Sequence, residues 1–385
     1  MKDIAIILGI RPDVIRASKI LKLLSNTTSL SYDFIWSGQH YSENMKDVFF
    51  EQLNVPKPDV EFEIEKGNDA EIVSSVIKNT YSHLEKNKYK AVIFLGDTNT
   101  VMGSIAVAQH NIPIVHIEGC MRSYDWRMPE EKYRTIIDHL SDRIYAYLDS
   151  YKNQGLHEGI SEKVIKVTGN PIVDVINENK NLFGTGEKFL SQEISKLIEN
   201  DKFLLATVHR RENVLEESSL TEIVNLINKT DTNVIFPMGY TTQKKIKEFD
   251  LHLNSNVHVC DPIGYLEFMH LLGRSDYVLS DSGTVVEEAC ILGTPSIQLR
   301  YSTERPEVYD VKSSVKFDPS EEHSEYESFL LKVENMKNTT WEQPFGDGSA
   351  SDEIVKDLVN LSNTDSFKKH TPSDYPFDIR NSFKG

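Results

Sequence analysis

Cysteine is scarce in this 385-residue chain, and its three cysteines, Cys120, Cys260 and Cys290, are far apart. They form no CxxC pair and no Cys/His spacing typical of a metal site, which indicates packed, reduced thiols. Long apolar runs are absent too, and none approaches the roughly 20 residues that a membrane-spanning helix needs. The first residues lead into a predicted strand rather than a signal peptide. The expectation is a cytoplasmic protein that does not span a membrane.

Basic residues are also in short supply. The chain has 42 lysines and arginines against 59 aspartates and glutamates, for a formal net charge of -17. This balance excludes broad binding to nucleic acid or to anionic membranes, because such partners need a basic surface. An anionic small molecule would depend on a few locally placed arginines. Low-complexity tracts and short internal repeats are likewise absent.

The chain does contain a repeated alternation of apolar, strand-like segments with helical ones. Its length predicts two domains of about 150 to 200 residues. Wholly apolar strands are typical of parallel sheets covered on both faces, so the pattern predicts two Rossmann-like, doubly wound α/β domains facing a cleft. The predicted strands are residues 3–8, 32–37, 89–97, 113–117, 143–148, 164–167, 203–208, 233–237, 257–260, 276–280 and 296–300. The predicted helices include residues 14–24, 45–50, 69–85, 100–110, 321–336 and 352–361.

A polar, glycine-containing stretch between residues 176 and 201 marks the expected domain boundary. We therefore expect an N-terminal domain over residues 1–172, a C-terminal domain over 173–363 and a polar tail over 364–385. The tail is predicted to be extended, and either to pack back on the first domain or to cross to a partner subunit. The acidic segment 59–65 is predicted to be a connector.

Residues 276–307, DYVLSDSGTVVEEACILGTPSIQLRYSTERPE, combine a strand, a turn and a helix. The backbone N–H groups of residues 282–285 begin the helix, where the helix dipole favours an anion such as phosphate. The alternative is that Asp281 only caps the helix and that Glu287 and Glu288 are solvated.

Charged side chains follow three strands of the first half. Arg11 lies in the turn after the first strand and Arg16 about one helical turn later. Two such arginines suit a diphosphate, although an arginine near a helix start is also common on surfaces. Asp97 and Glu118 lie at the ends of two further strands. Open parallel sheets bind ligands at this carboxyl edge, so an active site is predicted, with helix capping as the alternative.

The loop after Glu118 is dense in charge. Ten residues contain five charged side chains: Arg122, Asp125, Arg127, Glu130 and Glu131. A solvated, salt-bridged loop is the ordinary interpretation of such a pattern. Its place at the carboxyl end of a strand favours an active-site loop instead.

Taken in order, these motifs resemble those of the non-hydrolysing UDP-N-acetylglucosamine 2-epimerases. The resemblance covers nearly the whole chain, and both order and spacing match the family. The motifs are GIRPDVIRASKI at 9–20, SGQHY at 37–41, FLGDTNT at 94–100, VHIEG at 115–119, MPEEKYR at 128–134, VTGNP at 167–171, TVHRRENV at 207–214, SDSGTVVEEA at 280–289 and STERPE at 302–307.

The resemblance implies a GT-B architecture, a UDP-sugar in the cleft and a homodimer, with no nicotinamide, other cofactor or metal. It also implies reversible C2 epimerisation of UDP-N-acetylglucosamine (UDP-GlcNAc) to UDP-N-acetylmannosamine (UDP-ManNAc) for surface polysaccharide synthesis. In such enzymes the C2 proton is removed and UDP leaves from C1, giving 2-acetamidoglucal. UDP then adds back while a proton reaches the other face of C2. This chemistry needs acid/base groups on both faces of C2 and stabilisation of the leaving diphosphate.

Carried over residue by residue, the resemblance assigns acid/base roles to Asp97, Glu118 and Glu130 and places His209 near the departing diphosphate. Which carboxylate takes the proton and which returns it stays open, because close carboxylates titrate as a coupled set. The alternatives are a core position for His209 and pairing of Glu130 with Arg134. The predicted substrate-binding residues are Arg11, Ser282 and Gly283 for the pyrophosphate, Glu288 for the ribose, and also Arg16, Arg122, Arg210, Asn213 and Arg305.

Departures from the family pattern concern the substrate. The loop 122–129 is shorter than in typical members and closer to relatives that act on modified acetamido sugars, and Thr284 replaces a usual glycine. Gln39 matches a second, allosteric UDP-GlcNAc site, but Ser42 and Gly239 stand where longer polar side chains are expected. The alternatives to UDP-GlcNAc epimerisation are the same reaction on a modified sugar nucleotide, for example toward UDP-FucNAc, a hydrolysing epimerase that releases ManNAc and UDP, a GT-B glycosyltransferase, and a non-catalytic UDP-sugar-binding protein.

Overall fold

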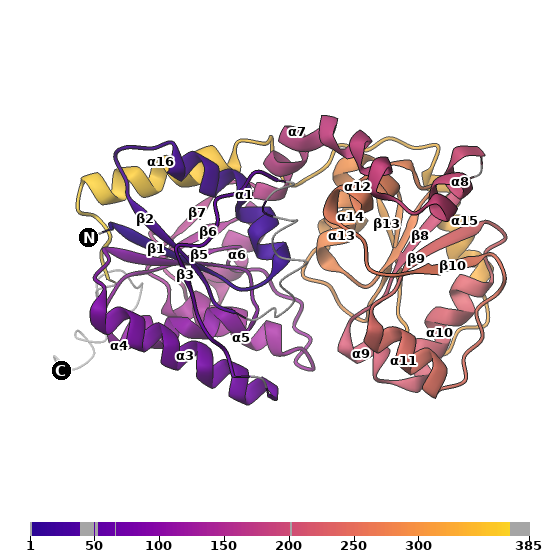
Figure 1. Ribbon diagram of the computed structural model, residues 1–385, viewed down its shortest axis with the longest axis horizontal. Helices are drawn as coiled ribbons and strands as arrows, with labels where there is room; N and C mark the ends of the chain where they lie inside the picture. The colour runs from indigo at the N-terminus through magenta and orange to yellow at the C-terminus, as the bar shows by residue number, and fades with distance from the viewer. Residues whose placement is uncertain (1, 39–49, 51–52, 66, 201, 370–385) are drawn as a thin grey trace, which may run out of the picture. The chain divides into compact units, whose positions relative to one another are not determined.

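The computed structural model describes residues 2–38, 50, 53–65, 67–200 and 202–369, and the chain divides into two α/β units (Figure 1). Unit 1 contains the chain up to Arg122, Met128–Asn177 and the chain from Phe345 onward. Unit 2 contains Ser123–Arg127 and Glu178–Pro344. Each unit is built on one parallel sheet, which confirms the predicted fold class of two Rossmann-like, doubly wound domains.

The sheet of unit 1 has seven parallel strands in the order β3-β2-β1-β4-β5-β6-β7. Its central strands are buried along their whole length, as expected for a parallel sheet with helices on both faces. The strands are β1 (Ile4–Leu8), β2 (Tyr32–Trp36), β3 (Val60–Glu61), β4 (Ala91–Leu95), β5 (Ile114–Ile117), β6 (Arg143–Ala146) and β7 (Ile165–Val167). The helices are α1 (Arg11–Ser25), α3 (Asp69–Lys86), the 3-10 helix η1 (Asn99–Gly103), α4 (Ser104–Gln109), α5 (Pro129–Leu140), α6 (Asp149–His157), α7 (Pro171–Phe183) and α16 (Ala350–Asn363). The last residues of α7, from Glu178, belong to unit 2.

The sheet of unit 2 has six parallel strands in the order β10-β9-β8-β11-β12-β13. Its strands are β8 (Phe203–Thr207), β9 (Asn233–Pro237), β10 (Val257–Cys260), β11 (Val278–Ser280), β12 (Ser296–Leu299) and β13 (Ser314–Phe317). The helical segments are η2 (Gly184–Phe189), α8 (Gln192–Asn200), α9 (Arg211–Val214), α10 (Glu217–Asn228), α11 (Tyr240–Glu248), α12 (Tyr265–Arg274), α13 (Gly283–Leu292), α14 (Glu307–Asp310) and α15 (Tyr326–Met336). Gly293 ends α13 in the left-handed conformation that glycine favours, as the sequence predicts.

The C-terminal helix corrects the predicted domain bounds. The sequence places residues 173–363 in one C-terminal domain, but the structure assigns α16 to unit 1 (Figure 1). Helix α16 packs on α1, and Asp357 accepts hydrogen bonds from Arg143 and Tyr145 of β6. The observed divisions are therefore at Asn177 and at Phe345.

The structure also differs from the sequence predictions at several smaller elements. The acidic connector 59–65 contains the edge strand β3, which pairs with β2. Strand β13 and helix α8 are real elements that the sequence analysis did not predict. The helix predicted over residues 45–50 lies outside the described residues apart from its last position.

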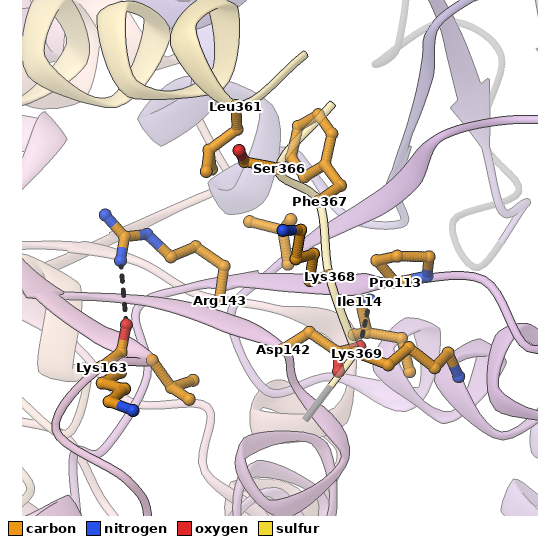
Figure 2. Close-up of a pocket in the computed structure, with 12 residues that line it drawn as sticks. Pro113, Ile114, Asp142, Arg143, Lys163, Leu361, Ser366, Phe367, Lys368 and Lys369 are labelled. Carbon is orange, nitrogen blue, oxygen red and sulfur yellow. Dashed lines mark hydrogen bonds between the residues drawn. The ribbon is translucent and has the colours of Figure 1, made fainter. Parts of the chain in front are cut away.

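The described part of the tail lies on unit 1. Ser366–Lys369 line a pocket of about 360 Å³ together with residues at the amino ends of β5, β6 and β7 (Figure 2). There Arg143 donates a hydrogen bond to the Lys163 carbonyl, and Asp142 accepts one from the backbone of Ile114. The pocket lies at the sheet edge opposite the strand ends that carry the predicted site. The rest of the tail lies outside the described residues, and none of the described helices is long and apolar enough to cross a membrane.

Candidate active site

The sheet order brings the predicted residues of each unit to one place. In unit 1, β1 and β4 are neighbours, although β2 and β3 lie between them in sequence. In unit 2, β8 and β11 are neighbours in the same way. Each pair is a topological switch point, where the following chain leaves to opposite sides and opens a crevice at the carboxyl edge. Arg11, Asp97 and Glu118 follow strands at this edge of unit 1, and His209 and Ser282 do so in unit 2.

Gly9 allows the close turn at the end of β1. A Cβ atom there would lie 1.7 Å from Thr100 Oγ1 and 2.5 Å from Ser37 Oγ. Only glycine therefore fits between the ends of β1, β2 and β4. Arg11 is then the first residue of α1 and is half-buried.

Glu118 is buried, and its carboxylate accepts hydrogen bonds from Arg16 and, at 2.9 Å, from the Tyr147 hydroxyl. Arg16 is itself buried and also donates to Asp13 Oδ1 at 3.1 Å. The sequence predicts that Arg16 binds the substrate diphosphate, and this stays a prediction. In the structure its guanidinium binds two carboxylates of its own unit, Asp13 and Glu118, and thereby orients Glu118.

Asp97 is held in a similar way by a second buried arginine. Arg134 of α5 donates to Asp97, and also to Glu131 Oε2 at 3.2 Å. Asp97 keeps partial exposure, with 16% of its side chain accessible. The sequence also allows a pair between Arg134 and Glu130. Glu130 lies half-buried in the first turn of α5, and this pairing stays a prediction. We call Asp13, Arg16, Asp97, Glu118, Arg134 and Tyr147 the unit 1 cluster.

Asp13 is the member of the unit 1 cluster with the most altered proton affinity. Burial raises its pKa from 3.8 to about 7, with the Arg16 guanidinium opposing the rise and the Asp97 carboxylate adding to it. The folded state therefore binds this proton more tightly than the unfolded state does. By linkage, the stability that comes from it is present below about pH 4 and is lost as the pH rises toward 7.

This gives a prediction for Asp13→Asn, which cannot titrate. The free energy of unfolding of the wild type should fall relative to that of the variant, by roughly 1 to 4 kcal/mol, between pH 4 and pH 8, since each pKa unit is worth about 1.4 kcal/mol. Urea unfolding of both proteins across this range measures the difference. Parallel pH profiles would contradict the raised pKa of Asp13.

Arg122 occupies a different position from the one that the sequence predicts for it. Its guanidinium is buried and donates to Asp138 at 2.7 Å and to Glu158 at 2.6 Å. Burial would raise the pKa of Glu158, but hydrogen bonds from His139 and Arg122 lower it to about 2. Arg122 therefore serves an internal ion-pair network, and its contact with the substrate stays a prediction.

In unit 2 the organising group is Asp281, which is fully buried. Its carboxylate accepts from the backbone N–H groups of His209, at 3.0 Å, and Arg210, at 2.8 Å, and from Asn213 Nδ2 at 3.2 Å. It also lies 3.2 Å from Nδ1 of His209, whose side chain is 58% exposed. The His209 imidazole is thus accessible, with Nδ1 beside the Asp281 carboxylate, and the alternative of a core histidine is wrong.

Helix α13 begins beside a buried arginine. Ser282, rather than Asp281, is the N-cap, and its hydroxyl accepts from the N–H of Val285 at 3.4 Å. A Cβ atom on Gly283 would lie 2.6 Å from Arg305 NH1. Arg305 pairs with Glu304 and, at 2.7 Å, with Glu287. We call His209, Asn213, Asp281, Gly283 and Arg305 the unit 2 cluster.

The α13 glutamates are buried, so the alternative that they are solvated is wrong. Glu287 pairs with Arg305, and Glu288, the predicted ribose ligand, lies one residue further along the same helix. A buried carboxylate has to be paired or hydrogen-bonded, and a polar ligand is one possible partner for Glu288.

Asp13, Tyr147 and the supporting role of Asp281 are not among the predictions from the sequence. Asp13 follows the recognised arginine by two residues, and Asp281 directly follows β11, so their positions carried a signal. Tyr147 directly follows β6 in the same way, but its uncharged side chain gave no chemical signal. Of the predicted allosteric positions, Gln39 and Ser42 lie outside the described residues, while Gly239 caps α11 beside Tyr240, which is 80% exposed.

Comparison with known proteins agrees with this geometry. The family described as UDP-N-acetylglucosamine 2-epimerase matches residues 22–359. A UDP-N-acetylglucosamine 2-epimerase of Methanococcus maripaludis is 39% identical over 366 residues, which cover 92% of this chain and 98% of the relative. A UDP-2,3-diacetamido-2,3-dideoxy-D-glucuronate 2-epimerase of Pseudomonas aeruginosa is 33% identical over 372 residues, which cover 92% of this chain and 99% of the relative.

A solved structure is similar over the same extent. The UDP-GlcNAc 2-epimerase of Methanocaldococcus jannaschii, in complex with UDP-GlcNAc and UDP, is 36% identical, with a TM-score of 0.83. The match covers 93% of this chain and 99% of that chain. Together with a family match over residues 22–359, these full-length similarities leave one conclusion: the chain belongs to the UDP-N-acetylglucosamine 2-epimerase family.

Proposed function

We propose that this protein reversibly converts UDP-GlcNAc to UDP-ManNAc by inverting C2 without net hydrolysis. The observation that carries the proposal is the unit 1 cluster, where Asp97 and Glu118 end neighbouring strands and each binds a buried arginine. Inversion by elimination needs one group that removes the C2 proton and another that returns a proton from the opposite face. Two separately held carboxylates are suited to this task.

The reaction balances without a cofactor. A base of unit 1 takes the C2 proton, and the C1–O bond breaks as its electrons leave with UDP, giving 2-acetamidoglucal. A proton then adds to the other face of C2 while a UDP oxygen forms the new bond to C1. Neither carbon changes its oxidation level overall, so the proposal needs no nicotinamide. Glu130 is the third acid/base candidate, and its role is part of the proposal.

We assign the nucleotide to residues of the unit 2 cluster. The N–H groups at the start of α13 supply positive charge for a diphosphate, and the Arg305 guanidinium beside Gly283 is proposed to contact it in addition to pairing with Glu287 and Glu304. His209, held by Asp281, is proposed to stabilise or protonate the departing UDP. Arg11 and Arg210 are further diphosphate candidates, Asn213 holds the His209 loop, and Glu288 is proposed to bind the ribose.

Proton NMR in deuterium oxide tests the reaction. Purified protein with UDP-GlcNAc should replace the C2 proton by deuterium and give a UDP-ManNAc anomeric signal. Deuterium enrichment without free UDP beyond trace leakage supports a non-hydrolysing epimerase. Accumulating UDP and ManNAc would support the hydrolysing alternative, and binding without exchange on any sugar would support a non-catalytic protein.

A second candidate substrate is a modified acetamido sugar nucleotide. The 33% identity to a relative that acts on UDP-2,3-diacetamido-2,3-dideoxy-D-glucuronate favours this candidate, as does the short loop 122–129. Side-by-side turnover of UDP-GlcNAc, a 6-deoxy sugar such as the precursor of UDP-FucNAc, and the diacetamido uronate decides between them. Action in the cytoplasm, as a homodimer and in surface polysaccharide synthesis is part of the proposal and is tested by fractionation, by mass in solution and by gene deletion.

Gly283→Ala should weaken nucleotide binding. The added Cβ would come within 2.6 Å of Arg305 NH1 and 2.9 Å of Glu304 Oε1, so the guanidinium has to move. We expect the UDP dissociation constant to rise about tenfold, which corresponds to about 1.4 kcal/mol. Calorimetric titration measures it, with Thr284→Ala, at the next helical position, as the matched control. Equal affinity in the Gly283 variant would argue against a diphosphate at this helix start.

A further inference from the structure

His116 is a buried histidine of β5 that the proposed reaction does not use. Its side chain has no exposure, and both ring nitrogens have partners. Nε2 lies 2.8 Å from the carbonyl oxygen of Gly96, and Nδ1 lies 2.7 Å from Oδ1 of Asp138 on α5. Gly96 directly precedes Asp97, and Asp138 bonds to the backbone N–H of Cys120, two residues after Glu118.

The partners fix the number of protons on the ring. A carbonyl oxygen only accepts, so Nε2 carries a hydrogen. Asp138 accepts from the N–H of Cys120 at 2.9 Å and from Arg122 at 2.7 Å through its other oxygen. Burial would raise the pKa of Asp138, but the hydrogen bonds from His116 and Arg122 lower it below its ordinary value. As an ionised carboxylate Asp138 also only accepts, and Nδ1 must donate as well.

The His116–Asp138 pair bonds to the backbone of two turns, the one after β4 and the one after β5. Through Nε2 it fixes the carbonyl of Gly96, and hence the peptide that precedes Asp97. Through Asp138 it fixes the N–H of Cys120, two residues after Glu118. Gly119 lies against the pair, since a Cβ there would be 2.7 Å from Asp138 Oδ1 and 3.2 Å from His116 Nδ1.

The turn that carries Glu118 needs such support. Glu118 and Cys120 have φ angles of 79° and 67°, in the left-handed region that residues other than glycine avoid. Each such residue is strained, and it keeps this conformation only where the surrounding contacts offset the cost. The N–H groups of Glu118 and Gly119 bond to the Tyr145 carbonyl, and the Cys120 N–H bonds to Asp138.

We propose that the His116–Asp138 pair is a positioning device for the reaction, an imidazolium–carboxylate bridge that sets Asp97 and Glu118 relative to each other. This inference rests on the proposed function. Neither side chain touches the substrate in this scheme, and their contribution is the geometry of the two proton-transfer groups. Misplacement of such groups by about 1 Å is enough to cost roughly a hundredfold in rate.

Two substitutions of His116 separate its two bonds. The amide nitrogen of an Asn lies near the place of Nδ1 and can donate to Asp138 but not to Gly96. The longer Gln reaches the place of Nε2 and can donate to Gly96 but not to Asp138. We expect His116→Asn and His116→Gln each to lower kcat roughly ten- to a hundredfold with KM changed less than about twofold, since positioning acts on the transition state.

Asp174→Asn is the matched control. Asp174 is a buried carboxylate of unit 1 that pairs with Lys19 at 3.4 Å and accepts from the Ser351 N–H at 2.9 Å, among helices α1, α7 and α16. Its loss should lower the melting temperature and leave kcat unchanged. A loss of kcat equal to that of the His116 variants would overturn the inference, as would normal kcat in folded His116 variants.

Nitrogen-15 NMR of the wild type gives a readout that does not depend on turnover. The resonances absent from the His116→Gln spectrum belong to His116, and both nitrogens should carry a proton, as the two acceptors beside them require. A nitrogen without a proton would overturn the charged bridge. Active wild type with unaffected His116 variants refutes only this inference, whereas wild type that turns over no sugar nucleotide refutes the proposed function and the inference with it.

Discussion

Replacing Glu118 by glutamine is expected to lower kcat for C2 epimerisation at least about a hundredfold while UDP binding is retained. Glutamine keeps the shape of the side chain but cannot take or return a proton. The fold should survive, because Arg16 still pairs with Asp13 when the charge of Glu118 is lost. Turnover by NMR and UDP affinity by calorimetry measure the two properties separately. Near-normal turnover would exclude Glu118 from the mechanism.

Tyr147→Phe is the matched control for Glu118. It removes only the hydroxyl that donates to the carboxylate at 2.9 Å, and leaves the bond from Arg16 in place. Its effect on kcat should therefore be roughly tenfold or less, the scale of one hydrogen bond. Asp97→Asn should behave like Glu118→Gln, since Arg134 keeps Glu131 as a partner.

Replacing His209 by asparagine should also lower kcat at least about a hundredfold, because an accessible imidazole is proposed to act on the departing diphosphate. Asp281→Asn tests the support beneath it. Three donors converge on the Asp281 carboxylate, and the NH₂ of an asparagine would face at least one of them. We expect a loss of kcat in this variant too, together with weaker UDP binding as the loop 209–213 shifts.

Arg211→Ala is the control for the His209 loop. Arg211 is an exposed neighbour on α9, outside the unit 2 cluster, and its loss should leave kcat within about twofold of wild type. If His209→Asn is as active as Arg211→Ala, the imidazole has no part in the chemistry. If Asp281→Asn alone is impaired, Asp281 acts on the fold of the loop and not through His209.

Four of the residues predicted from the sequence share one property: each lies within three residues of the carboxyl end of a strand that its own composition identifies. Arg11 follows β1, Asp97 follows β4, Glu118 follows β5 and His209 follows β8. Apolar runs mark such strands, and parallel sheets place ligands at their carboxyl ends. The strands and the site residues at their ends could therefore both be predicted from short stretches of sequence.

The partners of those residues were not local. Arg16 binds Glu118 across 102 positions of sequence, Arg134 reaches Asp97 across 37, and Asp281 holds His209 across 72. Such pairs depend on which strands become neighbours. Because β1 lies beside β4, and β8 beside β11, the residues that follow these strands lie close together. The order of strands in a sheet cannot be predicted from the periodicity of any one segment.

Local composition and motif order were enough to predict the two doubly wound domains, the family and the edge at which each unit carries its polar residues. The folded chain was needed to see that Arg16 and Arg122 form ion pairs within the protein, that α16 returns to unit 1, and that Asp281 supports His209. This is because periodicity and turn chemistry act over a few residues. Ion pairing and helix docking are decided by which distant surfaces are buried together.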